Sequence, residues 1–328
     1  MNITIFMATG CQNLGDELIL KNEIKLLENE NIGKKINFNV FSYDLKDDFL
    51  NLENIKYIEY FPIGIKNLKN IFINLKNLYL MIKAIFLSDE VVFGGGGIIF
   101  DNEKGNYSNP LKQILFRKKI AEFFNKKIRF FAISVDIKNE KNYKIVKNIF
   151  SNTKITVRDD LSKDFLTKLG IESQKNLDPV FYDNGDFIEN NNLLLKSIEP
   201  NEFGVGIFST INISGKTIGL ALRRGYFGEK EIYKINEVIK YLLKNNSKII
   251  LLPHSFHQID EVANDYLYLK QFLKPGVEIS SSIYETYDFY NQKKIDLCLS
   301  MRLHSMILSK VYGIEFIAIK YSKKTHMI

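Results

Sequence analysis

Cysteine is scarce in this chain of 328 residues, which contains only two. Cys11 and Cys298 do not show the paired spacing of a zinc site, and two cysteines cannot build a disulfide framework. So few cysteines, without such spacing, are typical of a reducing compartment. We therefore expect a protein without disulfide bonds that holds no structural metal.

Long apolar runs are also missing. The segment Leu75–Leu87 is rich in apolar side chains, but Lys76, Asn77 and Lys83 interrupt it too often for a membrane-spanning helix. The first residues, Met1–Phe6, lack the charged start and the apolar segment of a signal peptide. These absences predict a cytoplasmic protein, for which the inner face of the membrane is one place of action.

Acidic residues are outnumbered by basic ones, 38 to 45, so the net charge is +7. Aromatic and basic side chains do not alternate as they do in proteins that bind single-stranded nucleic acid, which argues against a nucleic-acid partner. The positive surplus fits an anionic substrate or a peripheral association with an anionic membrane surface. A simpler explanation of the positive surplus is that lysine serves as a generic polar residue on the surface.

Strands and helices alternate along the chain in two series. Short apolar runs such as Ile128–Ser134 precede helical segments in the first series, and Thr217–Leu222 begins the second. Alternation of this kind predicts an α/β protein with parallel sheets. The segment between the series is rich in Asn, Glu and Ser, and it indicates a linker with a short helix near Asn190–Lys196. The expected domains are residues 1–182 and 215–328, joined by residues 183–214.

Glycine-rich turns follow two strands of the first series. The strand Asn2–Ala8 leads through such a turn into a helix that begins near Asp16, a layout that can bind phosphate at the start of the helix. The GxGxxG spacing of dinucleotide sites is missing, and a tight turn capped by Asp16 is an equal interpretation. The strand Glu90–Phe93 runs into Gly94–Gly97, where a backbone without side chains favours a binding loop over a flexible turn.

Basic residues follow strands in both series. Arg158 comes directly after the strand Lys154–Val157, although a surface pair with Asp159 explains it as simply. In the second series, parallel strands would bring the residues at their carboxyl ends to one edge, where α/β sheets bind ligands. His254 and His257 lack a third metal ligand, which favours substrate binding or a structural hydrogen bond over a metal site. The pairs expected at this edge are Arg223 with Arg224, His254 with His257, and Arg302 with His304.

The last of these pairs lies where a strand meets a helix. The apolar run Ile295–Leu299 predicts a buried strand, Ser300 is a good N-cap, and Met301–Tyr312 predicts a helix that Gly313 ends. The pair then lies in the first turn of a helix, where anions bind. Arginine can bind a phosphate or carboxylate with two hydrogen bonds, and histidine can transfer a proton. A capped helix with a surface arginine and a half-buried histidine is an equal alternative.

The order of these segments resembles the polysaccharide pyruvyl transferase family. The resemblance covers nearly the whole chain and implies two Rossmann-like domains that face each other across a cleft, as in GT-B glycosyltransferases. It also implies an enzyme that transfers a pyruvyl group from phosphoenolpyruvate to two hydroxyls of a sugar, without a cofactor, to form a cyclic ketal. The residues that carry it are Asn13–Glu17, Gly94–Gly97, Val157–Asp159, Asp178–Pro179, Arg223–Arg224 and Ser300–His304.

The same resemblance implies roles for individual residues. His304 would be the catalytic residue, and Arg302 would bind phosphoenolpyruvate. The acceptor would be a sugar or a lipid-linked oligosaccharide that belongs to a cell-surface polysaccharide. Arginines after strands are expected to point into one cleft. The further residues expected at the substrate are Leu303, Arg223, Arg158, Asp16, Asn13, Gly95, Gly96 and His254.

Two other functions stay open at this point. A GT-B glycosyltransferase that uses a nucleotide sugar would have a similar anion-lined cleft, although the second half shows no convincing glutamate pair for the ribose of the donor. A truncated or non-catalytic sugar-binding relative is the other alternative. The chain ends at Ile328, soon after the strand predicted at Glu315–Lys320, whereas family members usually continue. We therefore expect a shortened second domain.

Overall fold

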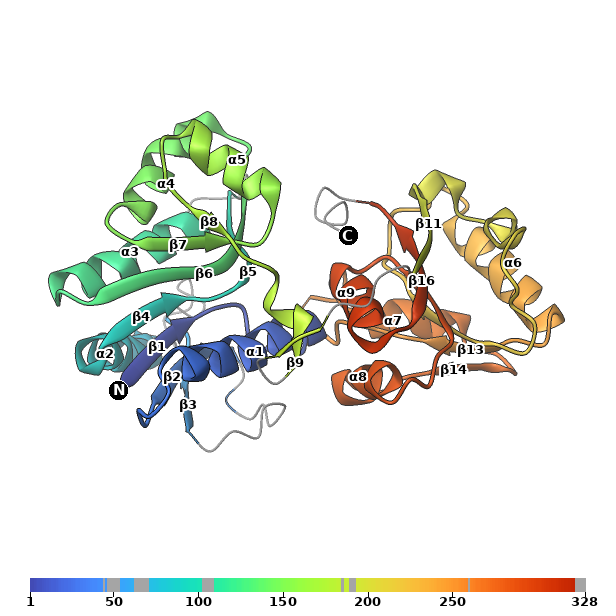
Figure 1. Ribbon diagram of the computed structural model, residues 1–328, viewed down its shortest axis with the longest axis horizontal. Coiled ribbons are helices and arrows are strands. Elements are labelled where there is room, and N and C mark those ends of the chain that lie inside the picture. Colours follow the sequence, from blue (N-terminus) through green and yellow to red (C-terminus); the bar gives the residue numbers. More distant parts are fainter. Residues whose placement is uncertain are drawn as a thin grey trace. The chain divides into compact units, whose positions relative to one another are not determined.

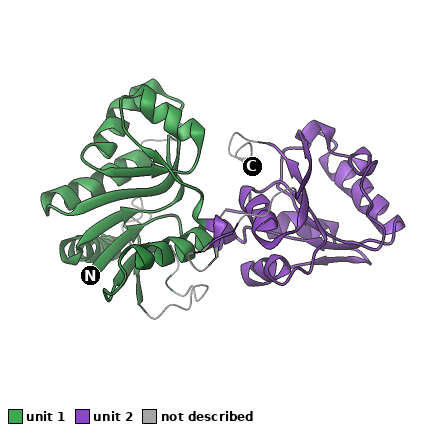
Figure 2. Cartoon of the chain, viewed as in Figure 1, with its two compact units in different colours: residues 1–10, 16–179 green, residues 11–15, 180–328 purple. Residues whose placement is uncertain are grey.

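The computed structural model describes residues 1–43, 45, 54–61, 71–101, 109–183, 186–188, 193–258 and 260–321. The chain forms two compact units, shown in different colours in Figure 2. Unit 1 contains residues 1–10 and 16–179, and unit 2 contains residues 11–15 and 180–328. Unit 2 therefore includes five residues from the N-terminal turn, far in sequence from the rest of the unit.

Unit 1 is built on a parallel sheet of eight strands. The order β3-β2-β1-β4-β6-β7-β8, with β5 beside β6, begins with the 3-2-1-4 arrangement of a Rossmann fold (Figure 1). The order reverses between β1 and β4, which makes the carboxyl ends of these two strands the expected ligand crevice. The strands are β1 (Asn2–Phe6), β2 (Asn37–Ser42), β3 (Ile55–Glu59), β4 (Glu90–Phe93), β5 (Gly96–Phe100), β6 (Lys127–Asp136), β7 (Lys154–Val157) and β8 (Gln174–Lys175).

A row of phenylalanines crosses this sheet. Phe41, Phe6, Phe93 and Phe130 are register partners on β2, β1, β4 and β6, and neighbouring rings stack with centroids 4.4 to 5.5 Å apart. Each such pair contributes roughly 0.5–1.5 kcal/mol beyond its buried area. The helices that connect the strands are α1 (Leu14–Glu30), α2 (Ile71–Leu87), α3 (Pro110–Phe123), α4 (Tyr143–Phe150) and α5 (Asp160–Lys168).

Unit 2 is built on a parallel sheet of six strands in the order β11-β16-β15-β12-β13-β14. Its order reverses between β12 and β15, so these strands define the ligand crevice of this unit. The strands are β11 (Leu194–Ile198), β12 (Thr217–Ala221), β13 (Lys248–Leu251), β14 (Val277–Ile279), β15 (Leu297–Ser300) and β16 (Glu315–Ile319), and the helices are α6 (Glu231–Lys244), α7 (Asp265–Leu269), α8 (Ile283–Asn291) and α9 (Leu303–Tyr312).

Short elements complete the described residues. A two-stranded antiparallel hairpin stands apart from both sheets. Its strands are β9 (Tyr182–Asp183) and β10 (Asp186–Phe187), and the short 3-10 helices are η2 (Glu140–Asn142), η3 (Pro179–Phe181), η4 (Pro200–Glu202), η5 (Val205–Phe208) and η6 (Lys270–Phe272).

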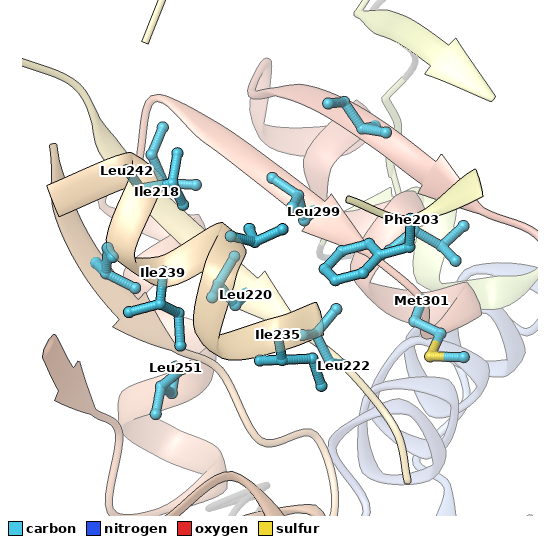
Figure 3. Packing of buried hydrophobic residues seen from close by; sticks show 14 of the residues in the cluster. Phe203, Ile218, Leu220, Leu222, Ile235, Ile239, Leu242, Leu251, Leu299 and Met301 are labelled. Carbon is cyan, nitrogen blue, oxygen red and sulfur yellow. The ribbon is translucent and has the colours of Figure 1, made fainter. Parts of the chain in front are cut away.

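The core of unit 2 fixes the ends of the two strands at its crevice. Ile235, Ile239 and Leu242 follow helical spacing on α6 and pack on the sheet, as Figure 3 shows. Leu222 and Met301 belong to the same buried cluster, and each directly precedes an arginine in the sequence. Burial of one such side chain contributes about 1.5–3 kcal/mol. The core therefore anchors the backbone from which Arg223 and Arg302 extend.

The two parallel sheets confirm the prediction of an α/β protein with two Rossmann-like domains. The short helix predicted near Asn190–Lys196 is wrong where the structure describes it, because Leu194–Ile198 forms β11 and pairs with β16. Residues 190–192 of that prediction lie outside the described residues. The segment predicted as a linker thus supplies an edge strand to the second sheet. Within the described ranges, no helix combines the length and apolarity that a bilayer crossing requires.

Candidate functional site

The carboxyl edge of the unit 2 sheet gathers the basic residues that follow its strands. Arg223 lies two residues after the end of β12, and Arg302 lies two residues after the end of β15. His254 follows β13, and its pKa is lowered by burial and also by the charges of Arg302 and His304. The prediction that these residues share the edge of one sheet is therefore confirmed for unit 2.

Arg302 is held by a buried carboxylate. Its Nε donates to Oδ2 of Asp265 at 2.9 Å, and its Nη2 donates to Oδ1 of the same residue. Asp265 is 3% exposed and lies in the first turn of α7, where the N-cap Asn264 accepts the backbone N–H of Leu267. Two hydrogen bonds to one carboxylate fix the plane of the guanidinium, which carries five N–H donors. Asp265 takes two of them and orients the group.

Helix α9 begins two residues later than the sequence predicts. Ser300 was expected as the N-cap, but its backbone belongs to β15 and pairs with Ala221 of β12, and its hydroxyl contacts Ser305 Oγ at 2.8 Å. Arg302 is the N-cap instead, with extended dihedral angles and no side-chain hydrogen bond to the helix. The first-turn N–H groups of α9 are therefore not satisfied by a capping side chain, and they favour a nearby anion.

The other end of this helix agrees with the sequence. Gly313 adopts the left-handed conformation, with φ of 71°, and ends α9 as predicted. Leu303 is the first residue of the helix and is buried, so its contact with a substrate would come from its backbone N–H. That contact stays a prediction.

The N-terminal turn completes the surroundings of His304. Asn13 forms a β-bridge with Ser255, and the N–H of Leu14 donates to the carbonyl of His254 at 2.9 Å. These bonds place the turn, residues 11–15, on the edge of unit 2 that carries His304. A Cβ built on Gly15 would overlap the imidazole of His304. Only glycine at position 15 therefore leaves room for the imidazole of His304 where it lies.

His254 lies in a buried network of hydrogen bonds. Its Nε2 is 3.0 Å from the hydroxyl of Tyr290, which is 2.7 Å from Oγ of Ser305 on α9. Its Nδ1 makes no hydrogen bond to any described residue. Burial, reinforced by Arg302 and His304, holds the pKa of His254 well below 6.5, so the ring is neutral near pH 7. His254 thus braces the start of α9, and its contact with substrate stays a prediction.

Arg223 extends from a loop that a second carboxylate holds. The carboxylate of Glu231 accepts the N–H groups of Gly225 and Phe227 at 3.0 Å and the hydroxyl of Tyr268. Burial alone would raise the pKa of Glu231, but these hydrogen bonds outweigh it and lower the pKa. The guanidinium of Arg223 is about 6 Å from the ring of Tyr321, whose hydroxyl is 3.4 Å from its Nη1.

Arg158 and Asp16 belong to unit 1 rather than unit 2. Arg158 is buried and pairs with Asp178 at 2.5 Å, while its Nε donates to Ser134 at 2.8 Å. The expected surface pair with Asp159 is wrong, because Asp159 instead accepts the backbone N–H of Ser162 at 2.7 Å and caps α5. The prediction that Arg158 shares one cleft with the other arginines stays a prediction.

The run of four glycines is explained by close packing against α1. A Cβ on Gly94 would lie 2.6 Å from Oε2 of Glu23, and one on Gly95 would lie 2.7 Å from Ile19. Gly96 has a φ of 92°, which side chains rarely allow, and lies beside Asp16. All three glycines are buried. Substrate binding by Gly95 and Gly96 stays a prediction, because close packing at Gly95 and the positive φ of Gly96 already give a reason for glycine.

Glu23 is a buried acid beneath this glycine run. Its Oε2 accepts the N–H of Gly95 at 3.0 Å, and its Oε1 makes no hydrogen bond to a described residue. Burial raises the pKa of Glu23 to about 8, against smaller opposing effects of the Gly95 N–H and Arg129. Glu23 is therefore mostly protonated at neutral pH.

Sequence reasoning missed three residues that shape the site, namely Asp265, Glu231 and Gly15. Asp265 and Glu231 are each the first residue of a helix, where acidic residues are common, and only their contacts with Arg302 and with the Arg223 loop show their roles. Gly15 was part of a recognised turn, but the turn was assigned to the first half of the chain. In the described parts of the chain, no three His, Cys, Asp or Glu residues form a group that could hold a metal ion.

Comparison with known proteins gives a family and a fold. The family model described as polysaccharide pyruvyl transferase matches residues 13–323. No curated protein matches the chain significantly. The chain is similar in fold to UDP-GlcNAc 2-epimerase from Methanocaldococcus jannaschii, with a TM-score of 0.50 and 13% sequence identity. The match covers 99% of this chain and 90% of that chain. A ugt transferase from Siraitia grosvenorii in complex with UDP matches with a TM-score of 0.50 and 10% identity, over 99% and 83% of the two chains.

Proposed function

The chain belongs to the polysaccharide pyruvyl transferase family, and we propose that it transfers a pyruvyl group from phosphoenolpyruvate to two hydroxyls of a sugar, forming a cyclic ketal. The sugar would be part of a cell-surface polysaccharide or its precursor. The observation that best supports this proposal is the start of α9, where Arg302 is oriented by Asp265 and His304 follows in the first turn.

Phosphoenolpyruvate carries a phosphate and a carboxylate, so its site needs several converging donors. In unit 2 these would be the guanidinium of Arg302, the first N–H groups of α9, and Arg223. Arginine suits both anions because it can give two parallel hydrogen bonds. Since Asp265 already fixes the guanidinium, little side-chain entropy would be lost when the anion binds. Leu303, Asn13 and His254 lie at the same edge and complete the proposed site.

His304 would move the protons of the reaction. It would donate a proton to the CH₂ carbon of phosphoenolpyruvate, which makes the neighbouring carbon electrophilic, and a sugar hydroxyl would add there. The imidazole left by the first step can accept the proton of that hydroxyl. The second hydroxyl would replace the phosphate, which leaves with one proton. The sum is one ketal and one inorganic phosphate per phosphoenolpyruvate, with no cofactor needed.

The assay that tests this proposal offers the purified protein phosphoenolpyruvate with a panel of sugar acceptors and measures phosphate release. We expect release that depends on the acceptor and yields a sugar heavier by one pyruvyl ketal. Arg302→Lys should weaken phosphoenolpyruvate binding markedly, because lysine cannot give two parallel hydrogen bonds. Glycosyl transfer from a nucleotide sugar in the same panel would favour the glycosyltransferase alternative, and neither activity would favour a non-catalytic sugar-binding protein.

The proposal includes a lipid-linked acceptor met at the inner face of an anionic membrane. Helix α2 in unit 1 supports this part, because its surface is apolar and basic. Phe72 is 83% exposed, and Leu75, Tyr79 and Phe86 are exposed at helical spacing along the same helix. Phe123 at the end of α3 is 78% exposed and contacts Phe124, whose ring lies 5.2 Å from Phe86. Large exposed apolar patches mark interaction sites.

Charge favours a lipid surface over a second copy of the chain. Helix α2 contains Lys76 and Lys83 and no acidic residue, and Lys126 lies 5.7 Å from the ring of Phe86. Two such faces would repel each other, whereas anionic lipids attract lysines by about 1 kcal/mol each. We expect the protein to sediment with phosphatidylglycerol vesicles but not with phosphatidylcholine vesicles. Phe72→Ser with Lys83→Glu should abolish this, and Tyr233→Ser, at an exposed tyrosine of α6, should not.

Equal sedimentation with both vesicle types would contradict a charge-guided surface. Self-association of the protein that the α2 variant removes, without any vesicle binding, would show that the face joins two copies of the chain.

A further inference from the structure

Unit 1 contains a cavity whose lining includes none of the residues proposed to bind phosphoenolpyruvate in unit 2. The cavity has a volume of about 210 Å³ and lies at the carboxyl ends of β1 and β4, where the strand order of this sheet reverses. Phe6 and Phe93 from the phenylalanine row form part of its wall, with Tyr43 and Tyr60. Crevices at such reversals are the usual ligand sites of α/β sheets.

The charged residue on the lining of this cavity is Arg117, which extends from α3. It is 7% exposed, and its guanidinium carbon lies 4.8 Å from the ring of Tyr60 and 5.3 Å from the ring of Phe6. Its Nη2 donates to the carbonyl of Phe61 at 2.9 Å and contacts Oε1 of Gln113 at 3.4 Å. These two bonds leave Nε and Nη1 without a partner among the described residues.

Arg117 differs from other buried basic residues of unit 1. Lys118 and Arg158 each form an ion pair with a carboxylate, but Arg117 pairs with no carboxylate in the described ranges. Burial lowers the pKa of Arg117, while the hydroxyls of Tyr60 and Tyr43 oppose this shift. A buried cation without a carboxylate is costly, and an anion in the cavity would compensate that cost. Contacts with two aromatic rings offset only part of it.

The size and walls of the cavity restrict the class of anion. A water molecule occupies about 30 Å³ in the liquid, so the cavity has room for several waters or one monosaccharide, and is below the usual range for drug-sized ligands. Aromatic rings offer flat apolar surfaces against which the C–H face of a sugar can pack, and Gln113 adds a polar contact on the lining. A free metal ion would be repelled by Arg117.

We propose that this cavity binds one sugar unit that carries an anionic group, either a carboxylate or a phosphate. This inference rests on the proposed function in one respect, because it takes the sugar to belong to the polysaccharide, or its precursor, on which the proposed enzyme acts. A carboxylate would come from a uronic acid in the polysaccharide, and a phosphate from an activated precursor. Either the carboxylate or the phosphate would accept hydrogen bonds from Nε and Nη1 of Arg117.

Isothermal titration calorimetry on the full chain tests the inference with glucuronate, glucose 1-phosphate and glucose. We expect at least one anionic sugar to bind, and glucose to bind at least about 10-fold more weakly. Arg117→Gln should weaken the binding of the anionic sugar by about 10-fold to 100-fold, the usual effect of losing a charged hydrogen-bond partner. Preference for glucuronate or for glucose 1-phosphate identifies the source of the charge.

A second variant covers the case in which Arg117→Gln does not fold. Ala8 is exposed and lines the cavity, so Ala8→Phe should fill it without removing any hydrogen bond of Arg117. Ala8→Phe should weaken the binding of the anionic sugar as strongly as Arg117→Gln does. Lys119→Gln removes the same charge from an exposed position of α3 and should change nothing.

The inference is overturned if neither anionic sugar binds, if glucose binds as tightly, or if a folded Arg117→Gln or Ala8→Phe variant binds normally. Phosphoenolpyruvate affinity should be the same in all these variants, and its loss with the sugar would show that the cavity is not a separate site. The two proposals fail separately. Arg117-dependent sugar binding without phosphate release would contradict the transfer reaction alone, while phosphate release without such binding would contradict the cavity alone.

Discussion

The imidazole of His304 occupies the space that a side chain at Gly15 would fill. A Cβ at position 15 would overlap Nδ1 and lie 2.5 Å from each of the two neighbouring ring carbons, Cγ and Cε1. The two residues are far apart in the sequence and meet because the turn at residues 11–15 bonds to the loop after β13. A glycine in an N-terminal turn therefore sets the position of a histidine near the end of the chain.

Gly15→Ala should reduce turnover while the protein remains folded. The methyl group would displace the His304 ring, and a shift of about 1 Å in a catalytic group can cost about 100-fold in rate. Gly204→Ala is the matched control, because its backbone is extended, with φ of 170°, and no atom lies within 4 Å of its Cβ position. Steady-state phosphate release from both variants gives the comparison. Normal turnover by Gly15→Ala would show that the ring position does not matter.

Asp265→Asn should weaken phosphoenolpyruvate binding and lower the free energy of unfolding. If Asp265 only neutralised Arg302, its loss would make anion binding tighter, whereas an orienting role predicts weaker binding. Breaking a buried pair costs about 3–5 kcal/mol, because one charge stays uncompensated. The Glu237→Gln control breaks the exposed pair with Lys240 and should leave the free energy of unfolding nearly unchanged. Urea unfolding and ligand titration measure the two effects, and tighter binding by Asp265→Asn would contradict the account.

Glu23→Gln should stabilise the protein above about pH 5, and increasingly so up to about pH 8. The carboxyl has a pKa of about 8 when folded, against an ordinary value of 4.5. Between these values the unfolded chain releases a proton that the folded protein keeps, so stability falls as the pH rises. Glutamine stays neutral and can still accept the N–H of Gly95, and its advantage at pH 7 should reach up to about 3 kcal/mol.

Urea unfolding from pH 4 to pH 8 measures this effect. Glu172→Gln, which changes an exposed acid, should leave the pH dependence unaltered. A Glu23→Gln variant less stable than the unmodified protein at pH 8 would show that Glu23 is charged in the folded state.

Local patterns in the sequence were enough to locate β12 and β15 and the residues at their carboxyl ends. This worked because buried parallel strands are continuous apolar runs, and because their order along the chain implies a common edge. Gly313 was also predicted correctly, since helix ends depend on neighbouring residues. The assignment of Arg302 and His304 to the start of a helix needed no long-range information.

Contacts between distant segments could not be predicted in this way. Ser300 looks like an N-cap, but its pairing with Ala221 on β12 keeps it in the strand. Asp265 reaches Arg302 across 37 positions of sequence. The glycine run looks like a ligand loop, and only the structure shows that Glu23 and Ile19 of α1 pack closely against Gly94 and Gly95. Each case depends on a contact with a residue that is distant in the sequence, and local propensity cannot predict such a contact.

In the proposed reaction, His304 transfers the protons of a pyruvyl transfer while Arg302 binds the donor. The most direct test measures turnover and phosphoenolpyruvate affinity side by side for a folded His304→Ala variant. We expect turnover to fall by roughly 10²–10⁴-fold, the usual size of general acid–base catalysis, while the affinity changes far less. Near-normal turnover, or a defect confined to binding, would contradict it and make His304 a ligand or a packing residue.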